Sequence, residues 1–180
     1  SGRRADGAYW WDATTGNFVS SSYYFDQLPP WAAEFNKSRA ADKFAGQNWG
    51  PAAGGTPFMM LPSTPGPAYW TGVVGTSFGN DLLVMMAKAA IDGEKLGQRD
   101  SADLLAISFS SCDTIGHRKG PHSPEIHDVA LSTDKVLTDL FNHLDKTVGM
   151  KNVLVVFTAD HGVSPMPEYN QKYKMPGGRA

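Results

Sequence analysis

Two pairs of an aspartate and a histidine are the residues of this chain best suited to chemistry. Asp113 and His117 lie in the segment SCDTIGH, and Asp160 and His161 are adjacent in TADHG. Carboxylate oxygens and neutral imidazole nitrogens together suit a divalent transition metal, zinc first among them, better than magnesium or calcium. The sequence therefore predicts that these four side chains bind one or two metal ions.

Each pair follows a short apolar run. Residues 104–109 precede the first pair and residues 153–157 the second, with an amphipathic helix between them that starts at Ser123 and ends near Gly149. This order indicates a strand–helix–strand unit in which both runs are buried, parallel strands of one sheet covered by helices. Open α/β sheets bind ligands at the carboxyl ends of their strands. We therefore expect both pairs at one sheet edge.

The spacing within each pair suggests how the side chains converge. In the first pair, the three intervening residues let a loop fold so that both side chains face one point. In the second pair, adjacent side chains diverge, so they serve different metals or surround one metal from two sides. Two such pairs could hold two metal ions about 3.5–4 Å apart, the separation used in phosphoryl displacement.

Composition limits the class of protein. The chain has 180 residues, 41% of them hydrophobic, and a net charge of −2, which predicts one globular domain or part of one. No basic run suggests a nucleic-acid surface, and no apolar stretch approaches the roughly 18 residues that cross a bilayer. The single cysteine, Cys112, excludes an internal disulfide, and a start at Ser1 predicts a processed or excised chain.

The chain divides near residue 77. Residues 1–76 contain all five tryptophans and are predicted to form an aromatic hairpin over residues 8–24, a short helix from Pro30, and an irregular loop over residues 46–75. Residues 77–180 form the regular α/β segment, which includes a helix over residues 80–96. We expect both parts to belong to one larger domain, with the tryptophans packed onto it.

Other polar residues have simpler structural interpretations. Two histidines near the first pair are expected to be solvated or helix-capping, and a third to lie at the surface of the long helix: His122, His127 and His143. Cys112 is expected to be a small core residue. Three aspartates are expected on the polar face of the same helix: Asp128, Asp134 and Asp145.

The motifs also resemble a known family. The segments LLAISFSSCDTIGHRKGPHSPEIHD and LVVFTADHGVSPMPE are similar to the alkaline phosphatase superfamily, in its type I phosphodiesterase/nucleotide pyrophosphatase branch. TSFGNDLLVMMAKAAIDGEKLG and LFNHLDKTVG match as well, and GAYWWDATTGNFVSSSYY and LPPWAAEFN resemble PafA-type alkaline phosphatases. The resemblance implies an α/β fold, an α/β/α sandwich with a parallel central sheet, of which this chain holds part.

The resemblance implies a chemistry and a ligand set. Asp113 and His117 would be ligands of one zinc, and Asp160 and His161 of a second, with manganese or iron left open as alternatives. The family's nucleophilic threonine or serine and its further ligands have no counterpart here, so the chain alone is expected to be inactive. The full-length enzyme would be exported to the periplasm and would hydrolyse small phosphate esters through a phospho-enzyme.

Two alternatives remain open from the sequence. The residues that select monoesters over diesters have no counterpart here, so a phosphodiesterase or nucleotide pyrophosphatase is the second interpretation after a phosphomonoesterase. The third belongs to another class, a non-catalytic metal-binding or interaction module whose aromatic surface meets a partner. A nucleophile motif in the full-length protein would favour the enzyme.

Overall fold

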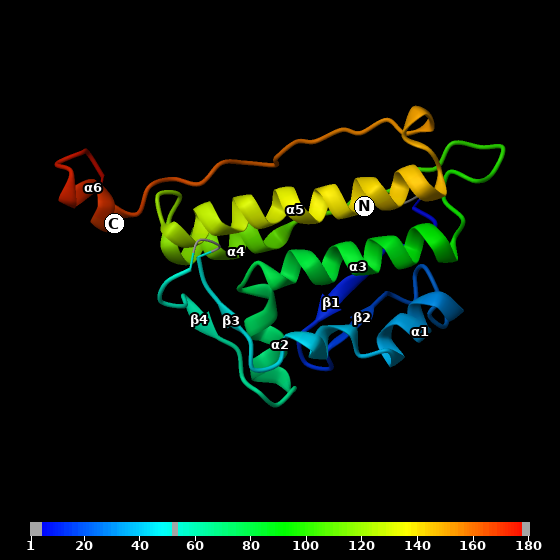
Figure 1. The fold of residues 1–180 in the computed structure, drawn as a ribbon, viewed down its shortest axis with the longest axis horizontal. Helices are drawn as coiled ribbons and strands as arrows, with labels where there is room; N and C mark the ends of the chain where they lie inside the picture. Colours follow the sequence, from blue (N-terminus) through cyan, green and yellow to red (C-terminus); the bar gives the residue numbers. More distant parts are fainter. Residues whose placement is uncertain (1–4, 52–53, 178–180) are drawn as a thin grey trace.

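The structure is a computed structural model that describes residues 5–51 and 54–177. Two long helices, α3 (Phe78–Gly93) and α5 (Pro124–Thr147), lie side by side through the middle of the molecule (Figure 1). The short helix α1 (Pro30–Lys37) packs on the other side of α3, and α4 (Ser110–Lys119) packs on α5. The helices therefore form the frame on which the remaining segments lie.

The predicted aromatic hairpin is confirmed. Strands β1 (Trp10–Asp12) and β2 (Asn17–Val19) pair antiparallel. The turn between them is held by the Asp12 carboxylate, which accepts hydrogen bonds from the Thr14 amide at 2.9 Å and the Thr15 hydroxyl at 2.7 Å. Such a side-chain bond to the following backbone is the usual reason for aspartate at a turn.

The stretch of residues 46–75 is more regular than its glycine and proline content predicts. It contains the short antiparallel strands β3 (Asn48–Trp49) and β4 (Met59–Met60) and the helix α2 (Pro67–Val74). Pro67 does not interrupt α2 because a proline in the first turn of a helix loses no hydrogen bond. The predicted loop is thus wrong for these three elements.

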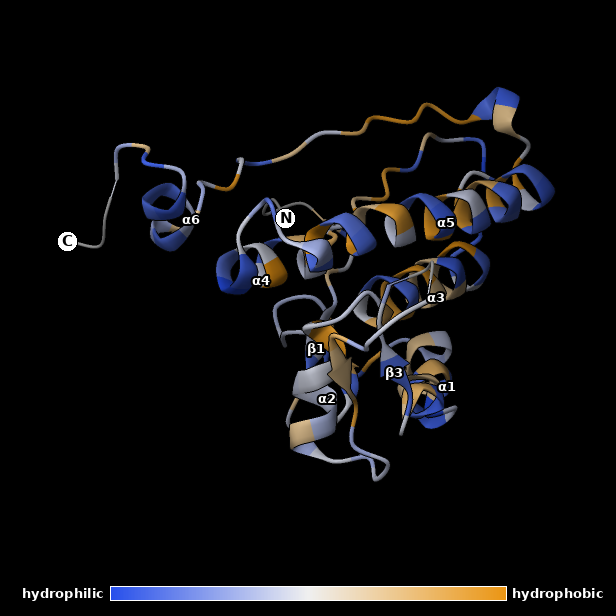
Figure 2. Cartoon of the chain, turned by 60° about the vertical axis from the view of Figure 1, so that its left-hand side comes forward, coloured by the Kyte–Doolittle hydropathy of each residue, from blue (hydrophilic) through white to orange (hydrophobic). Residues whose placement is uncertain are grey.

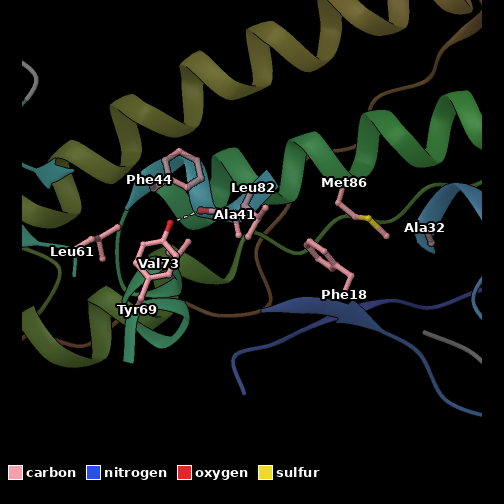
Figure 3. Packing of buried hydrophobic residues seen from close by; sticks show 9 residues of the cluster. All are labelled: Phe18, Ala32, Ala41, Phe44, Leu61, Tyr69, Val73, Leu82 and Met86. Atoms are coloured by element: carbon pink, nitrogen blue, oxygen red, sulfur yellow. Dashed lines mark hydrogen bonds between the residues drawn. The ribbon is translucent and has the colours of Figure 1, made fainter. Parts of the chain in front are cut away.

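The first hydrophobic core joins the aromatic half to α3 (Figure 3). The Tyr69 side chain is fully buried at its centre, and its hydroxyl donates to the backbone carbonyl of Ala41, in the 3-10 helix η1 (Ala40–Phe44). Burial raises the pKa of Tyr69 to about 12. The buried members of the cluster are Phe18, Ala32, Ala41, Phe44, Leu61, Tyr69, Val73, Leu82 and Met86.

Four of the five tryptophans pack onto this frame, as the sequence predicts, whereas Trp10 is 46% exposed. Trp11, Trp31 and Trp70 contact the first core, and the Trp31 indole lies over the end of α3. A Cβ on Gly93 would come within 2.3 Å of the Trp31 ring. Gly93 is therefore required for close packing between α1 and α3, and α3 ends there, earlier than the predicted residue 96.

Helix α5 begins where the sequence predicts. The Ser123 hydroxyl accepts a hydrogen bond from the Ile126 amide at 3.3 Å, which caps the first turn. One face of α5 and one face of α3 bury a second hydrophobic cluster of Val84, Ala87, Ile91, Val136 and Leu140. The amphipathic pattern of both helices therefore predicts correctly which of their faces is buried.

The predicted parallel pairing of the two apolar runs is not formed among the described residues. The sheets found there are the two antiparallel pairs β1–β2 and β3–β4. Residues 104–109 contact the second core through Ile107 and Phe109, whereas Leu104 is exposed. Residues 153–157 extend along the outer side of α5 in Figures 1 and 2, with Leu154 89% exposed. A strand forms only where a neighbour accepts its backbone hydrogen bonds, and neither run has one here.

Short elements complete the description. The 3-10 helix η2 (Met150–Asn152) follows α5, and α6 (Pro167–Lys172) lies beyond α4 at the end of the described chain (Figure 1). Within residues 5–51 and 54–177, no helix is long and apolar enough to pass through a bilayer.

Candidate metal centre

The first aspartate–histidine pair lies on helix α4, whereas the sequence predicted a loop. Asp113 and His117 are four residues apart, so an α-helix places both side chains on one face. The start of α4 is fixed by the Ser111 hydroxyl, which donates to the Val74 carbonyl at 3.1 Å, and Gly120 ends the helix with a φ of +77°. The convergence predicted for a loop is achieved here by helical periodicity.

Two glycines share this face of α4. Gly116 and Gly120 follow Asp113 by three and seven residues, and the segment after residue 160 crosses the helix at both. A Cβ on Gly116 would lie 3.0 Å from the Val163 side chain, and one on Gly120 would lie 2.5 Å from that of Met166. The glycines therefore let this segment approach the helix closely. Sequence analysis missed them, although their spacing from Asp113 is a helical one.

The close approach brings the second pair to the first. The Nε2 atom of His161 lies 3.6 Å from Asp113 Oδ1 and 3.6 Å from Asp160 Oδ2. The Nε2 atom of His117 lies 3.3 Å from the same Asp113 Oδ1. The structure thus gathers all four side chains that the sequence analysis selected.

Asp113 Oδ1 is the atom at the centre of this group. It is buried and has no hydrogen-bond partner among the described residues, although two imidazole nitrogens lie 3.3 and 3.6 Å away. A buried carboxylate oxygen without a partner is costly. Its position between two imidazole nitrogens is a reason to expect a cation there.

The tautomer of His161 follows from its surroundings. Nδ1 lies 3.0 Å from the Gly162 carbonyl, which can only accept, so we assign the ring proton to Nδ1. The lone pair of the neutral ring is then on Nε2, which faces Asp113. The Gly162 hydrogen bond, followed by the charges of Asp160 and Asp113, raises the pKa of His161. A proton or a metal ion between these two acceptors would stabilise the arrangement.

A cavity of about 340 Å³ opens onto these side chains. Asp113, His117 and His161 line one part of it, and the mostly apolar segment from Val163 to Pro167 lines another. The sequence analysis did not predict this second wall. A cavity of this volume, lined at one part by carboxylate and imidazole groups, can hold a small anionic group together with an organic substituent.

The four side chains are of the types that bind zinc. They are not close enough to one another to form a complete zinc site. Among residues 5–51 and 54–177, no three histidine, cysteine or acidic side chains converge tightly enough to form a complete metal site. Asp160 is the least constrained of the four, with its side chain 89% exposed. The orphaned Asp113 oxygen and the orientation of His161 are the features that favour a metal.

Other candidate residues lie apart from the group. The His122 ring stacks on Tyr169 at 4.3 Å between centroids, and His143 pairs with Asp92 across α3 and α5 at 2.8 Å. Cys112 packs against a third hydrophobic cluster, as expected, and burial raises the pKa of its thiol. The sequence predicted Asp128 on the polar face of α5, but the structure buries its side chain.

Comparisons with known proteins identify the family of this chain. Residues 1–176 match the model of the type I phosphodiesterase/nucleotide pyrophosphatase family, and the chain belongs to that family. It is 40% identical over 200 residues to alkaline phosphatase PhoV of Synechococcus elongatus, a match that covers 99% of this chain and 36% of that protein. It is 34% identical over 209 residues to alkaline phosphatase PafA of Elizabethkingia meningoseptica, covering 99% of this chain and 37% of that protein.

A solved structure confirms the fold class. The crystal structure of wild-type alkaline phosphatase PafA matches with a TM-score of 0.86 and 35% identity, over 97% of this chain and 38% of that chain. The fold is therefore a segment of the alkaline phosphatase fold, as the resemblance implied. The chain spans little more than a third of the length of these relatives.

Proposed function

We propose that the full-length protein is a metal-dependent hydrolase of phosphate esters, of the alkaline phosphatase type. The observation that carries the proposal is that Asp113, His117 and His161 meet at one cavity, with Asp160 beside His161 and with a buried Asp113 oxygen that lacks a hydrogen-bond partner among the described residues. Family membership supports the reaction class, since the similar proteins PhoV and PafA are both named alkaline phosphatases.

The four side chains would act as metal ligands and not as proton-transfer groups. Asp113 and His117 would hold one zinc ion, and Asp160 and His161 a second. Bound zinc would supply positive charge for the transferring phosphoryl group and would lower the pKa of a hydroxyl or water. The Gly162 carbonyl keeps the His161 Nε2 lone pair available, and the glycines of α4 allow the two pairs to meet.

Charge and shape indicate the kind of substrate. Two carboxylates only partly neutralise two divalent cations, so the site would remain positive and attract a phosphate group. The wall from Val163 to Pro167 would face the organic part of the ester. We propose small phosphomonoesters as substrates, because the two relatives described above are alkaline phosphatases that match nearly the whole chain.

A phosphodiesterase or nucleotide pyrophosphatase is the second candidate. The family model that matches residues 1–176 carries that description, which favours diester substrates. Both candidates would use the same metal ligands. They differ in the substrate, because a phosphomonoester carries one organic group on its phosphate and a phosphodiester carries two.

The test is hydrolysis of an aryl phosphate monoester and the matching diester by the full-length protein, before and after removal of zinc with a chelator. We expect chelation to abolish turnover, zinc to restore it, and the monoester to be preferred. His117→Ala should lower kcat/KM by more than a hundredfold, since loss of an outer-shell partner alone costs about 10–100-fold. His127→Ala on α5 is the matched control, because His127 does not line the cavity.

Two results would contradict the proposal. Turnover that survives complete metal removal would exclude a metal-dependent site. An unchanged kcat/KM in His117→Ala would exclude this group of residues. Preference for the diester would instead replace the first substrate class with the second.

A further inference from the structure

Two faces of helix α4 have different roles. The outer face carries Asp113 and His117, and the inner face buries Ile115, which is 2% exposed. Ile115 belongs to a hydrophobic cluster with Trp49 of β3 and Val129 of α5. Since Ile115 lies between the two ligand candidates in sequence, whatever fixes this cluster also fixes the direction in which they point.

A buried hydrogen bond fixes one side of the cluster. The indole Nε1 of Trp49 donates to Asp128 Oδ2 at 2.7 Å, between residues 79 positions apart in the chain. Trp49 is 4% exposed and Asp128 is 5% exposed. The bond therefore joins the β3–β4 hairpin to α5 directly beneath the inner face of α4.

The bond restricts how the indole can sit. Trp49 touches Phe58 edge to face at 5.2 Å between ring centroids, a contact that depends on the orientation of the indole. A short hydrogen bond to a buried carboxylate oxygen selects one orientation. Burying a carboxylate is costly unless it is hydrogen-bonded, so a purely structural role would be served more cheaply by an apolar pair.

We infer that Asp128 and Trp49 position the metal-binding face of α4: their hydrogen bond sets the cluster against which Ile115 packs, and thereby orients Asp113 and His117. The inference rests on the proposed function. It assigns the two residues no contact with metal or substrate, and the hydrogen bond rather than the charge of Asp128 does the positioning.

The experiment compares four variants of the full-length protein. Trp49→Phe removes the donor, Asp128→Leu removes the acceptor, and Asp128→Asn keeps an acceptor oxygen for the indole. Tyr69→Phe is the matched control, because it also breaks a buried hydrogen bond of an aromatic residue, but in the first core, whose buried members include no residue of α4. Zinc affinity is measured by competition with a chelator, and amide hydrogen exchange of α4 and η1 by mass spectrometry without metal.

We expect Trp49→Phe and Asp128→Leu to weaken zinc binding about tenfold or more and to speed exchange in α4. Asp128→Asn should keep near-normal affinity and exchange. Tyr69→Phe should speed exchange in η1 and leave zinc affinity unchanged, which separates positioning from general loss of stability.

Unchanged exchange of α4 in Trp49→Phe and Asp128→Leu would overturn the inference whatever the metal result. So would an Asp128→Asn variant that behaves like Asp128→Leu, because charge would then be the property that matters. Failure of the unaltered protein to bind zinc would overturn the proposed function instead, and the metal-free exchange would still decide whether the bond holds α4.

Discussion

Large apolar side chains are buried in the aromatic half of the chain and exposed in residues 153–157, the segment that precedes the second metal-ligand pair. In the aromatic half, Phe18 is buried between the rings of Trp11 and Phe35, with centroids 5.3 and 5.8 Å away. In the segment of residues 153–157, Leu154 and Phe157 are 89% and 75% exposed. Both regions are apolar, so hydrophobicity alone does not determine where a side chain lies.

The difference separates stability from function. The aromatic half interlocks through rings and forms the first core, whereas the donor group is held by a few contacts at the glycines of α4. We therefore expect substitutions in the first region to unfold the chain, and substitutions in the second to remove metal binding while the fold persists.

The largest expected effect is on stability. In the 180-residue chain, Phe18→Ala should lower the free energy of unfolding by about 3–5 kcal/mol, because it empties a filled core site. The same change at Phe157 should stay within about 0.5 kcal/mol. Urea denaturation of both variants checks this pair. Equal losses would show that residues 153–157 are buried in solution.

The next effect is on metal content. Asp160→Ala in the full-length protein should lower the zinc bound per molecule, measured by elemental analysis, because it removes one of the four donors. Its thermal midpoint without metal should be unchanged, since the Asp160 side chain is 89% exposed. Asp134→Ala, another exposed aspartate, is the control. Normal zinc content in Asp160→Ala would remove this residue from the ligand set.

Gly116→Ala should change stability and metal binding in opposite directions. Alanine favours the helix by up to about 1 kcal/mol over glycine. The new Cβ would lie 3.0 Å from the Val163 side chain and push the segment that carries His161 away from α4. We expect a higher melting temperature of the metal-free protein and zinc affinity lower by about tenfold. Unchanged affinity would mean that the close approach is not needed.

The smallest effect is a difference in pH dependence between two aspartates. Hydrogen bonds from Thr15 and Thr14 lower the pKa of Asp12, so its stabilising contribution is present above the unfolded pKa and is lost as pH falls through the folded value. Burial raises the pKa of Asp81, so stability is lost as pH rises from the unfolded value through the folded one.

At pH 7, Asp12→Asn should therefore lower the melting temperature and Asp81→Asn should raise it, and both differences should fade in acid. Thermal unfolding monitored by circular dichroism between pH 3 and 7, about one unit below to three above the aspartate reference value, measures this. Differences of the same sign would contradict the assigned causes.

Local signals in the sequence predicted the hairpin and the helices α1, α3 and α5. Ser123 followed by proline gave the start of α5, and its helical periodicity gave the buried face, because capping and amphipathicity act within a few residues. The structure places His117 and His161 within 3.3 and 3.6 Å of Asp113, and the role of the four donors as metal ligands stays a prediction. The glycine-rich stretch concealed α2, since proline at a helix start resembles proline in a loop.

Features that depend on distant residues could not be predicted. The burial of Asp128 depends on Trp49, which is 79 positions away, and no local pattern indicates that bond. The two apolar runs have the composition of buried strands, but a strand also needs neighbours, and composition does not supply them. The helical spacing of Asp113 and His117 was interpreted as a loop because the pair follows a run that was predicted to be a strand.

Anomalous diffraction at the zinc edge from crystals of the full-length protein tests the central claim most directly. We predict two zinc peaks at the cavity, one bound by Asp113 and His117 and the other by Asp160 and His161, with ligand distances of about 2.0–2.2 Å. Zinc bound elsewhere, or an empty cavity in zinc-saturated crystals, would contradict the assignment of these four residues as the metal centre.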